Sequence, residues 1–169
     1  MKNTSSYKIA LSAILIALAA ALSYTERFIP LGLIVPLPGI KLGLANVVSM
    51  VALFFIGFKS AFAILVLRCL LTSFFGGFSS LMFSLVGGIM AVIMMELIRR
   101  AKIFSIYGIS IGGSIMHVTG QVLTSMLIMK SYYVLSYLPV LLVSAVITGT
   151  VTALISSQVL KRAEKAIKL

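Results

Sequence analysis

Long runs of apolar residues, separated by short polar or glycine-bearing breaks, dominate the chain. At about 20 residues per membrane crossing, these runs predict six transmembrane helices. They cover residues 7–25, 42–58, 60–76, 79–98, 107–129 and 134–160. The second and third runs are separated only by Phe58-Lys59-Ser60, which predicts a tight hairpin. We therefore expect residues 1–169 to form one transmembrane domain, an all-α bundle of six helices.

Small residues recur every four positions in the first run, at Ala13, Ala17 and Ala21. Side chains at positions i and i+4 share one helix face, so these alanines form a smooth strip on which another helix can lie closely. Two interpretations are open. The strip packs inside this chain, or it is the docking face for a partner protein.

A polar stripe marks the fifth run, where Gly113, His117, Gln121 and Thr124 fall on one face with Gly120 beside them. Such a stripe suits hydrogen bonding to a flat or polar ligand. The alternative is a ladder of hydrogen bonds between helices, each worth only about 0.6 kcal/mol on average.

A rigid segment, Pro36-Leu-Pro-Gly-Ile-Lys-Leu-Gly-Leu-Ala-Asn-Val-Val48, leads into the second run. It places Lys41 at the membrane edge and Asn46 about one turn deeper. Polar groups there are costly unless they face protein, water or a ligand, so the segment is either a helix-start turn or part of a binding site. The connection before it, residues 23–40, is apolar, and we expect it to fold back over the helices, where it would suit a lid.

Arg68 lies near the middle of the third run, where a guanidinium costs at least ~2.5 kcal/mol. It should therefore point inward to a carboxylate, carbonyl groups, water or an anionic ligand. Glu96 is better placed to pair with Arg99 and Arg100, three and four residues further on. Arg68 thus lacks an obvious partner, which favours a functional role.

The composition is 61% hydrophobic with a mean hydropathy of +1.20, which excludes a soluble domain of this size. The net charge of +11 does not indicate nucleic-acid binding, because the basic residues are spread among apolar segments. With both termini in the cytoplasm, ten Lys and Arg residues fall on the inner side and three on the outer side. Cytoplasmic loops are enriched in these residues, so we expect a multi-pass protein of the cell membrane with both termini cytoplasmic.

The sequence lacks the residues that ATP hydrolysis and metal binding require. No phosphate-binding G-x-x-x-x-G-K-[ST] motif occurs, so ATP hydrolysis is not encoded in this chain. One histidine and one cysteine without a nearby carboxylate cluster do not suit a metal site. We expect no metal and no resident cofactor.

Four features together resemble one family: Pro38-Gly-Ile-Lys-Leu-Gly-Leu-Ala-Asn46, Arg68, Ser84-Leu-Val-Gly-Gly88, and His117 with Gly120-Gln121. In these the chain is similar, along nearly its whole length, to the Gx transporter family, often labelled heptaprenyl diphosphate synthase component I. One departure is Val118, where an asparagine is expected. That family looks like a relative of the S components of energy-coupling factor transporters, which are six-helix membrane proteins.

The resemblance implies a vitamin-like ligand bound near the outer face, beneath the first loop. It also implies partners, one transmembrane coupling protein and two ATPases, with the strip of Ala13, Ala17 and Ala21 as the docking face. The predicted function is a substrate-binding transporter subunit for a small vitamin-like or anionic ligand. Its predicted ligand-binding residues, converging on one cavity, are Lys41, Asn46, Arg68, His117 and Gln121.

The synthase label suggests an enzyme instead. Prenyl diphosphate synthesis needs clustered aspartates to hold Mg²⁺, and the sequence contains no aspartate, so we expect no catalysis. A third possibility is an accessory membrane protein of quinone or prenyl-lipid metabolism, or of flavin-based extracellular electron transfer. His117 and Gln121 would suit hydrogen bonding to a quinone or flavin ring.

Overall fold

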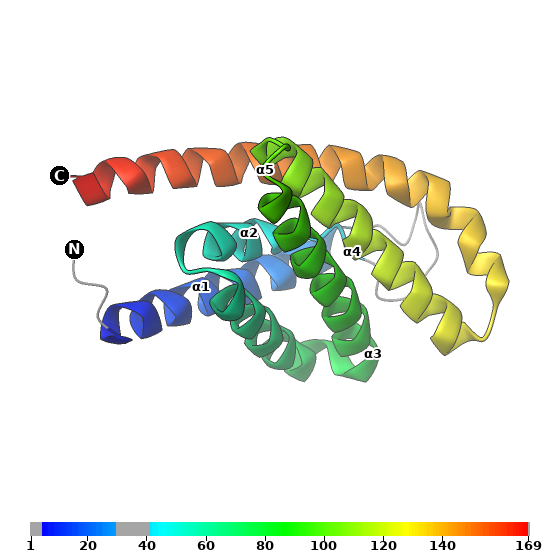
Figure 1. The fold of residues 1–169 in the computed structure, drawn as a ribbon. Coiled ribbons are helices and arrows are strands. Elements are labelled where there is room, and N and C mark those ends of the chain that lie inside the picture. The colour runs from blue at the N-terminus through cyan, green and yellow to red at the C-terminus, as the bar shows by residue number, and fades with distance from the viewer. Residues whose placement is uncertain (1–4, 30–40, 169) are drawn as a thin grey trace.

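The computed structural model describes residues 5–29 and 41–168, and every regular element within these ranges is helical (Figure 1). The elements are α1 (Ser5–Thr25), η1 (Glu26–Phe28), α2 (Asn46–Phe55), α3 (Phe58–Ala101), α4 (Ile106–Met129), η3 (Tyr132–Tyr137) and α5 (Leu138–Lys168). Four of these helices, α1, α3, α4 and α5, are long and apolar enough to cross a membrane. The chain is therefore an all-α, multi-pass membrane protein, as the hydrophobic pattern predicted.

Helix α3 is folded back on itself at Gly77. This residue has φ 70° and ψ −179°, a conformation that residues with a Cβ rarely adopt. The two arms, residues 58–76 and 78–101, run in different directions (Figure 1). A Cβ at Gly77 would meet no atom within 4 Å, so close packing does not require a glycine at this position. Backbone conformation, and not packing, explains this glycine.

Helix α2 is shorter than the predicted second segment. Residues 41–45 are not helical, and Gly57, with φ 99°, separates α2 from α3. Ten helical residues extend only about 15 Å, whereas the hydrocarbon core is about 30 Å thick. Six crossings are therefore not confirmed, because one of the six predicted segments contains a half-length helix.

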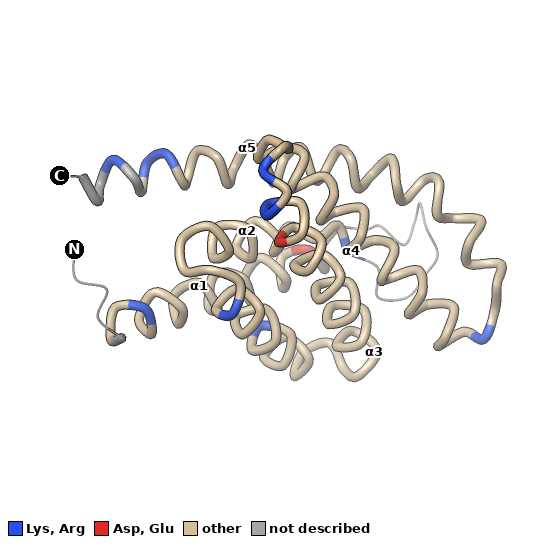
Figure 2. Tube along the Cα trace, viewed as in Figure 1, with Lys and Arg blue, Asp and Glu red and all other residues tan. Residues whose placement is uncertain are grey.

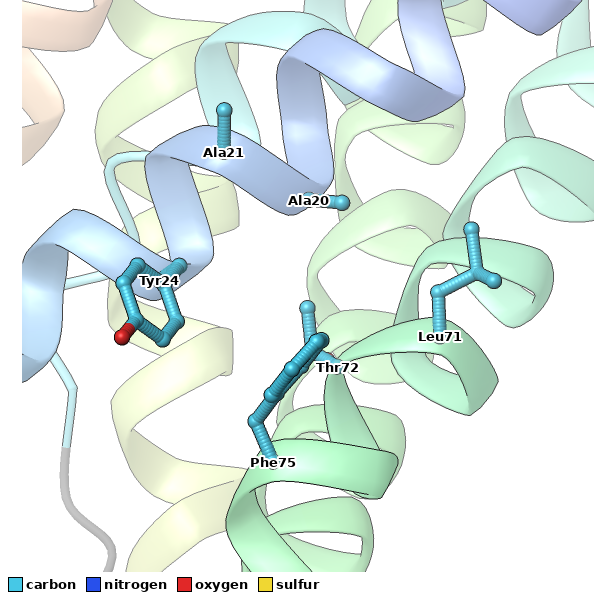
Figure 3. Close-up of a pocket in the computed structure, with 6 residues that line it drawn as sticks. All are labelled: Ala20, Ala21, Tyr24, Leu71, Thr72 and Phe75. Atoms are coloured by element: carbon cyan, nitrogen blue, oxygen red, sulfur yellow. The ribbon is translucent and has the colours of Figure 1, made fainter.

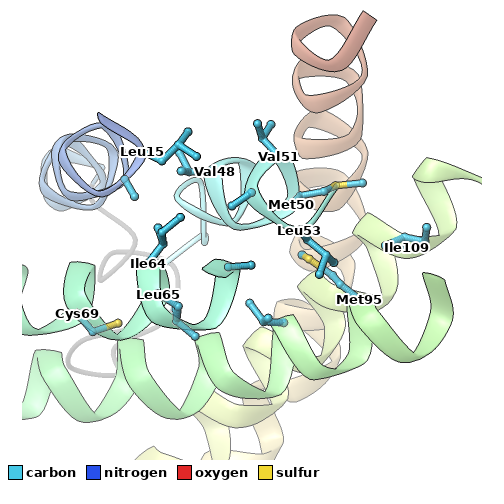
Figure 4. Packing of buried hydrophobic residues seen from close by; sticks show 14 residues of the cluster. Leu15, Val48, Met50, Val51, Leu53, Ile64, Leu65, Cys69, Met95 and Ile109 are labelled. Carbon is cyan, nitrogen blue, oxygen red and sulfur yellow. The ribbon is translucent and has the colours of Figure 1, made fainter. Parts of the chain in front are cut away.

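Most of α2 is nonetheless buried, and it forms the centre of the main hydrophobic core. Val48, Met50 and Leu53 of α2 lie among side chains from its neighbours (Figure 4). Those labelled in the picture are Leu15 of α1, Ile64, Leu65, Cys69 and Met95 of α3, and Ile109 of α4. A short helix surrounded by longer ones positions its first residue, Asn46, deep inside the bundle.

The second arm of α3 and helix α4 approach each other through glycines. A Cβ on Gly120 would lie 2.8 Å from the Cα and 3.1 Å from the backbone nitrogen of Gly87. Backbone atoms cannot move aside as a flexible side chain can, so this crossing requires glycine. Gly87 and Gly120 thus allow α3 and α4 to pack closely.

We expect Gly120→Ala to destabilise the bundle by about 1–3 kcal/mol, the usual cost of overpacking a well-packed site. Gly108→Ala in the same helix is the matched control, because its Cβ would meet only the half-exposed side chain of Phe104. Thermal unfolding in detergent should show a lower midpoint for Gly120→Ala and little change for Gly108→Ala. Equal midpoints for the two variants would contradict a backbone-limited crossing.

The alanine strip of α1 does not pack inside the described part of the chain. Ala13, Ala17 and Ala21 are all exposed, while Leu15 and Ala19 face the core. The structure thus disfavours the first interpretation of the strip, and docking to a partner protein stays a prediction.

The structure bears on two predictions about charged residues, the pairing of Glu96 and the location of the basic residues. Glu96 accepts hydrogen bonds from Arg99 at 2.8 Å and from Arg100 at 2.7 Å, so the predicted pairing is confirmed. The first turns of α1 and the last turns of α5 lie at the same end of the molecule (Figure 1), and both carry basic residues (Figure 2). The cytoplasmic location of that end stays a prediction.

Candidate functional site

A group of polar side chains lies where the segment before α2 meets α3 and α4. The backbone N–H of Lys41 donates to Gln121 Oε1 at 3.4 Å. The amide nitrogen of Gln121 lies 3.1 Å from His117 Nε2, to which it donates one turn along α4. These contacts join the start of the second predicted segment to the polar stripe of the fifth.

Three glycines bring the remaining predicted residues to the same place. A Cβ on Gly43 would lie 2.9 Å from Asn46 Nδ2 and 3.0 Å from His117 Cδ2. On α3, a Cβ on Gly87 would lie 3.0 Å from His117 Nδ1, and one on the next residue, Gly88, would lie 3.4 Å from Arg68 Nη2. The structure therefore places Lys41, Asn46, Arg68, His117 and Gln121 as near neighbours.

Glu26 is a further member that the sequence analysis did not select. It is only 4% exposed, and its Oε1 accepts a hydrogen bond from the backbone N–H of Leu44. Its carboxylate interacts electrostatically with Arg68 and Lys41. We name Glu26, Lys41, Asn46, Arg68, His117 and Gln121 the polar cluster.

Serine hydroxyls support both cations of the polar cluster. Lys41 Nζ donates to Ser80 Oγ at 3.0 Å and to Ser84 Oγ at 2.9 Å. Arg68 Nη1 donates to Ser23 Oγ at 3.1 Å. A signal for Ser84 was present in the Ser84–Gly88 motif, whereas Ser23 and Ser80 carried none. Neutral hydroxyls hold these cations in place without cancelling their charge.

Three members of the polar cluster retain buried hydrogen-bonding atoms without partners among residues 5–29 and 41–168. These atoms are both amide atoms of Asn46, Nε and Nη2 of Arg68, and Nδ1 of His117. A buried donor or acceptor left unpaired costs about 1–3 kcal/mol, and more for a charged group. Native proteins leave few such groups, and a bound molecule is one reason to keep them. The arrangement can donate to an anionic group and orient it.

Burial raises the pKa of Glu26 above its ordinary value of 4.5, only partly offset by the Leu44 N–H bond and by Arg68 and Lys41. Folding therefore favours the protonated acid. The stability that this group contributes is fully present below its unfolded pKa and is lost as the pH rises through the higher folded pKa.

Glu26→Gln should consequently remove this pH dependence while its amide oxygen still accepts from Leu44. As the pH rises from below the unfolded pKa of Glu26, the unfolding midpoint of the wild type should fall relative to that of Glu26→Gln. Thermal unfolding at matched ionic strength measures the difference. A wild type that gains stability over the variant with rising pH would show that the charged form is favoured.

Two other residues of α4, Val118 and Thr124, are not part of the polar cluster. Val118 is buried with Val122, Val134, Leu141 and Ala145, in a separate apolar cluster against η3 and α5. The departure from the family pattern at Val118 thus lies away from the polar cluster. Thr124 donates to the carbonyl of Gly120 in its own helix.

The predicted lid, residues 23–40, lies largely outside the described residues, as do Pro36, Pro38 and Gly39.

Among curated proteins and among solved structures, none matches the chain. The family described as heptaprenyl diphosphate synthase component I matches residues 15–159, a range that includes the whole polar cluster. This range covers most of the 169 residues, and it agrees with the resemblance seen in the sequence motifs. The chain therefore belongs to the heptaprenyl diphosphate synthase component I family.

Proposed function

We propose that this protein is the ligand-binding membrane subunit of a transporter of the energy-coupling factor type, located in the cell membrane. Its ligand is a small anionic or vitamin-like molecule held by the polar cluster. The observation that carries this proposal is the set of buried, unpartnered atoms on Asn46 and Arg68 at the centre of a membrane-spanning bundle, counted among the described residues.

The charge of the polar cluster supports an anionic ligand. Lys41 and Arg68 stand against one carboxylate, that of Glu26, which burial inclines toward its neutral form. Cations inside a membrane protein are expensive, and they commonly mark a substrate or ion path. Hydrogen bonds from a cation to an anion are shorter and about twice as strong as neutral ones, so an anion would satisfy Arg68 well.

In this proposal the side-chain amide of Asn46 orients the ligand. Asn46 is fully buried and presents one donor group and one acceptor, whereas Gln121 is already engaged by Lys41 and His117. A small number of fixed polar groups inside a largely apolar surround is the usual construction of a small-molecule site. In this proposal Arg68 binds the anionic group and Asn46 selects the part of the ligand beside it.

Energy for transport would come from other proteins, since the sequence holds no nucleotide-binding loop. The exposed strip of Ala13, Ala17 and Ala21 would let a coupling protein's helix approach α1 closely. We propose this strip as the docking face for one transmembrane coupling protein, which would in turn bind two ATPases.

The direct experiment is mass spectrometry of small molecules extracted from the protein purified in mild detergent. An anionic molecule should be recovered from the wild type at roughly one per chain, and it should be lost from Asn46→Leu. Leu53→Met, a change in the neighbouring core that keeps side-chain volume, is the control for α2. Recovery of the same molecule from wild type and Asn46→Leu would contradict the assignment of the site.

A second candidate is an accessory protein of quinone or prenyl-lipid metabolism, or of flavin-based extracellular electron transfer. The buried His117–Gln121 pair favours it, because such a pair could hydrogen-bond a quinone or flavin ring. Absorption spectra of the purified protein separate a flavin from colourless ligands. The synthase reaction itself is disfavoured by the lack of aspartate, and product formation from isoprenyl diphosphates by the purified chain would overturn that view.

A further inference from the structure

A groove with a volume of about 290 Å³ lies between α1 and the first arm of α3 (Figure 3). Its lining residues are Ala20, Ala21, Tyr24, Leu71, Thr72 and Phe75. The lining is almost entirely apolar, and Leu71 and Phe75 are well exposed on the outside of the bundle. Because α1 and α3 are membrane-spanning, an open apolar groove between them faces the hydrocarbon of the bilayer.

Arg68 does not itself line the groove, but it lies about one helical turn before the groove residues of α3. Leu71, Thr72 and Phe75 follow Arg68 by three, four and seven residues, so all four lie on one face of the helix. On α1, Ser23 accepts the hydrogen bond from Arg68 and directly precedes Tyr24 of the groove. Helices α1 and α3 therefore hold the Arg68 cation close to the apolar groove that lies between them.

The side chain of Arg68 also indicates a ligand. It is 4% exposed, and its Nε and Nη2 have no hydrogen-bond partner within the described ranges. The rings of Tyr24 and Phe75 meet edge to face at 5.8 Å and join the two walls of the groove. The groove's volume of about 290 Å³ is at the small end of the range for small-molecule sites, ~300–1,000 Å³, which suits one hydrocarbon chain better than the two of a phospholipid.

We infer that the ligand is a single-chain amphiphile, with an anionic head group bound at Arg68 and a hydrocarbon tail lying in the groove between α1 and α3. This inference rests on the proposed function and names the class of its substrate. It also gives the ligand a lateral path, since a tail that lies in the groove can remain in contact with the bilayer while the head enters the bundle.

The test uses three probes added to the full chain in phosphatidylcholine nanodiscs: dodecyl phosphate, methyl phosphate and dodecanol. Binding is measured by native mass spectrometry. Leu71→Trp fills the groove, and Leu71→Phe fills it partly. Leu70→Trp is the matched control, because Leu70 and Leu71 are 47% and 46% exposed and only Leu71 lines the groove.

Dodecyl phosphate should bind the wild type more tightly than either methyl phosphate or dodecanol. Leu71→Trp should weaken dodecyl phosphate at least fivefold, with a smaller loss for Leu71→Phe and none for Leu70→Trp. Methyl phosphate should bind all of these variants equally. Dioleoyl phosphatidic acid placed in the nanodisc should compete poorly, and strong competition would overturn the single-chain assignment in favour of a membrane lipid.

Two failures are distinguishable. Unchanged dodecyl phosphate binding in Leu71→Trp, with both phosphates still lost in Arg68→Met, overturns the tail groove and leaves an anion-binding subunit. Equal binding of both phosphates to wild type and Arg68→Met removes the anion site, on which the inference and the proposed function both depend.

Discussion

Replacing Arg68 with methionine should reduce the ligand recovered with the purified protein at least tenfold. A hydrogen bond to a charged group contributes about 1.5–3 kcal/mol, and tenfold in affinity corresponds to about 1.4 kcal/mol. Methionine has a similar length and no charge, so it fills the site of a side chain that is 4% exposed without burying a new polar group. Mass spectrometry of extracted small molecules measures the loss.

The bundle should survive this change. Arg68→Met leaves the Glu26 carboxylate without one of its two nearby cations, but burial already raises its pKa, so protonation relieves the remaining cost. The double variant Glu26→Gln with Arg68→Met removes that cost altogether. It should be at least as stable as Arg68→Met and should remain unable to retain the ligand.

Two further variants separate charge from geometry. Arg68→Lys keeps the positive charge but loses the planar fork of donors, so ligand recovery should be intermediate. Arg99→Met removes a cation that pairs with Glu96 far along α3, and it should leave ligand recovery unchanged. Full recovery of ligand from a folded Arg68→Met protein would contradict the anion site.

The fold was predictable where a single helix explains the pattern. Long apolar runs between breaks predict α1, α4 and α5 because a membrane-spanning helix satisfies its own backbone and needs length and hydropathy alone. The short α2 was not predictable in this way. Residues 42–58 are apolar except for Asn46 and Ser49, but the helix begins only at Asn46, because Gly43 has a positive φ and Glu26 accepts from Leu44. The contact with Glu26 comes from a segment 18 residues away and leaves no local pattern.

The candidate site shows the same division. Periodicity along one helix brought His117 and Gln121 together, and the cost of a charge in lipid singled out Arg68. Glu26 was missed because it follows the first apolar run, at the position of an ordinary loop acid, and only the tertiary fold buries it beside Arg68. Ser80 lies 39 residues from Lys41, and no local pattern links two such residues.

Gly43→Ala should have the second large effect, because it combines backbone strain with an intrusion into the polar cluster. Gly43 has φ 83°, and holding a residue with a Cβ in such a region costs of order 1–3 kcal/mol. The new Cβ would also lie 2.9 Å from Asn46 Nδ2 and 3.0 Å from His117 Cδ2, so both side chains must move. We expect lower thermal stability and at least a tenfold loss of ligand, measured on the same preparations.

Gly57→Ala isolates the contribution of the polar cluster. Gly57 also has a positive φ, 99°, but a Cβ there would meet no atom within 4 Å. This control should show backbone strain alone, with a lower unfolding midpoint and full ligand recovery, since Gly57 lies at the other end of α2 from Asn46. Loss of ligand in both variants would mean that general destabilisation, and not displacement of Asn46 and His117, empties the site. Loss in Gly43→Ala alone would place the ligand against the first turn of α2. The Cβ at Gly43 meets Asn46 and His117, whereas the Cβ at Gly57 meets neither.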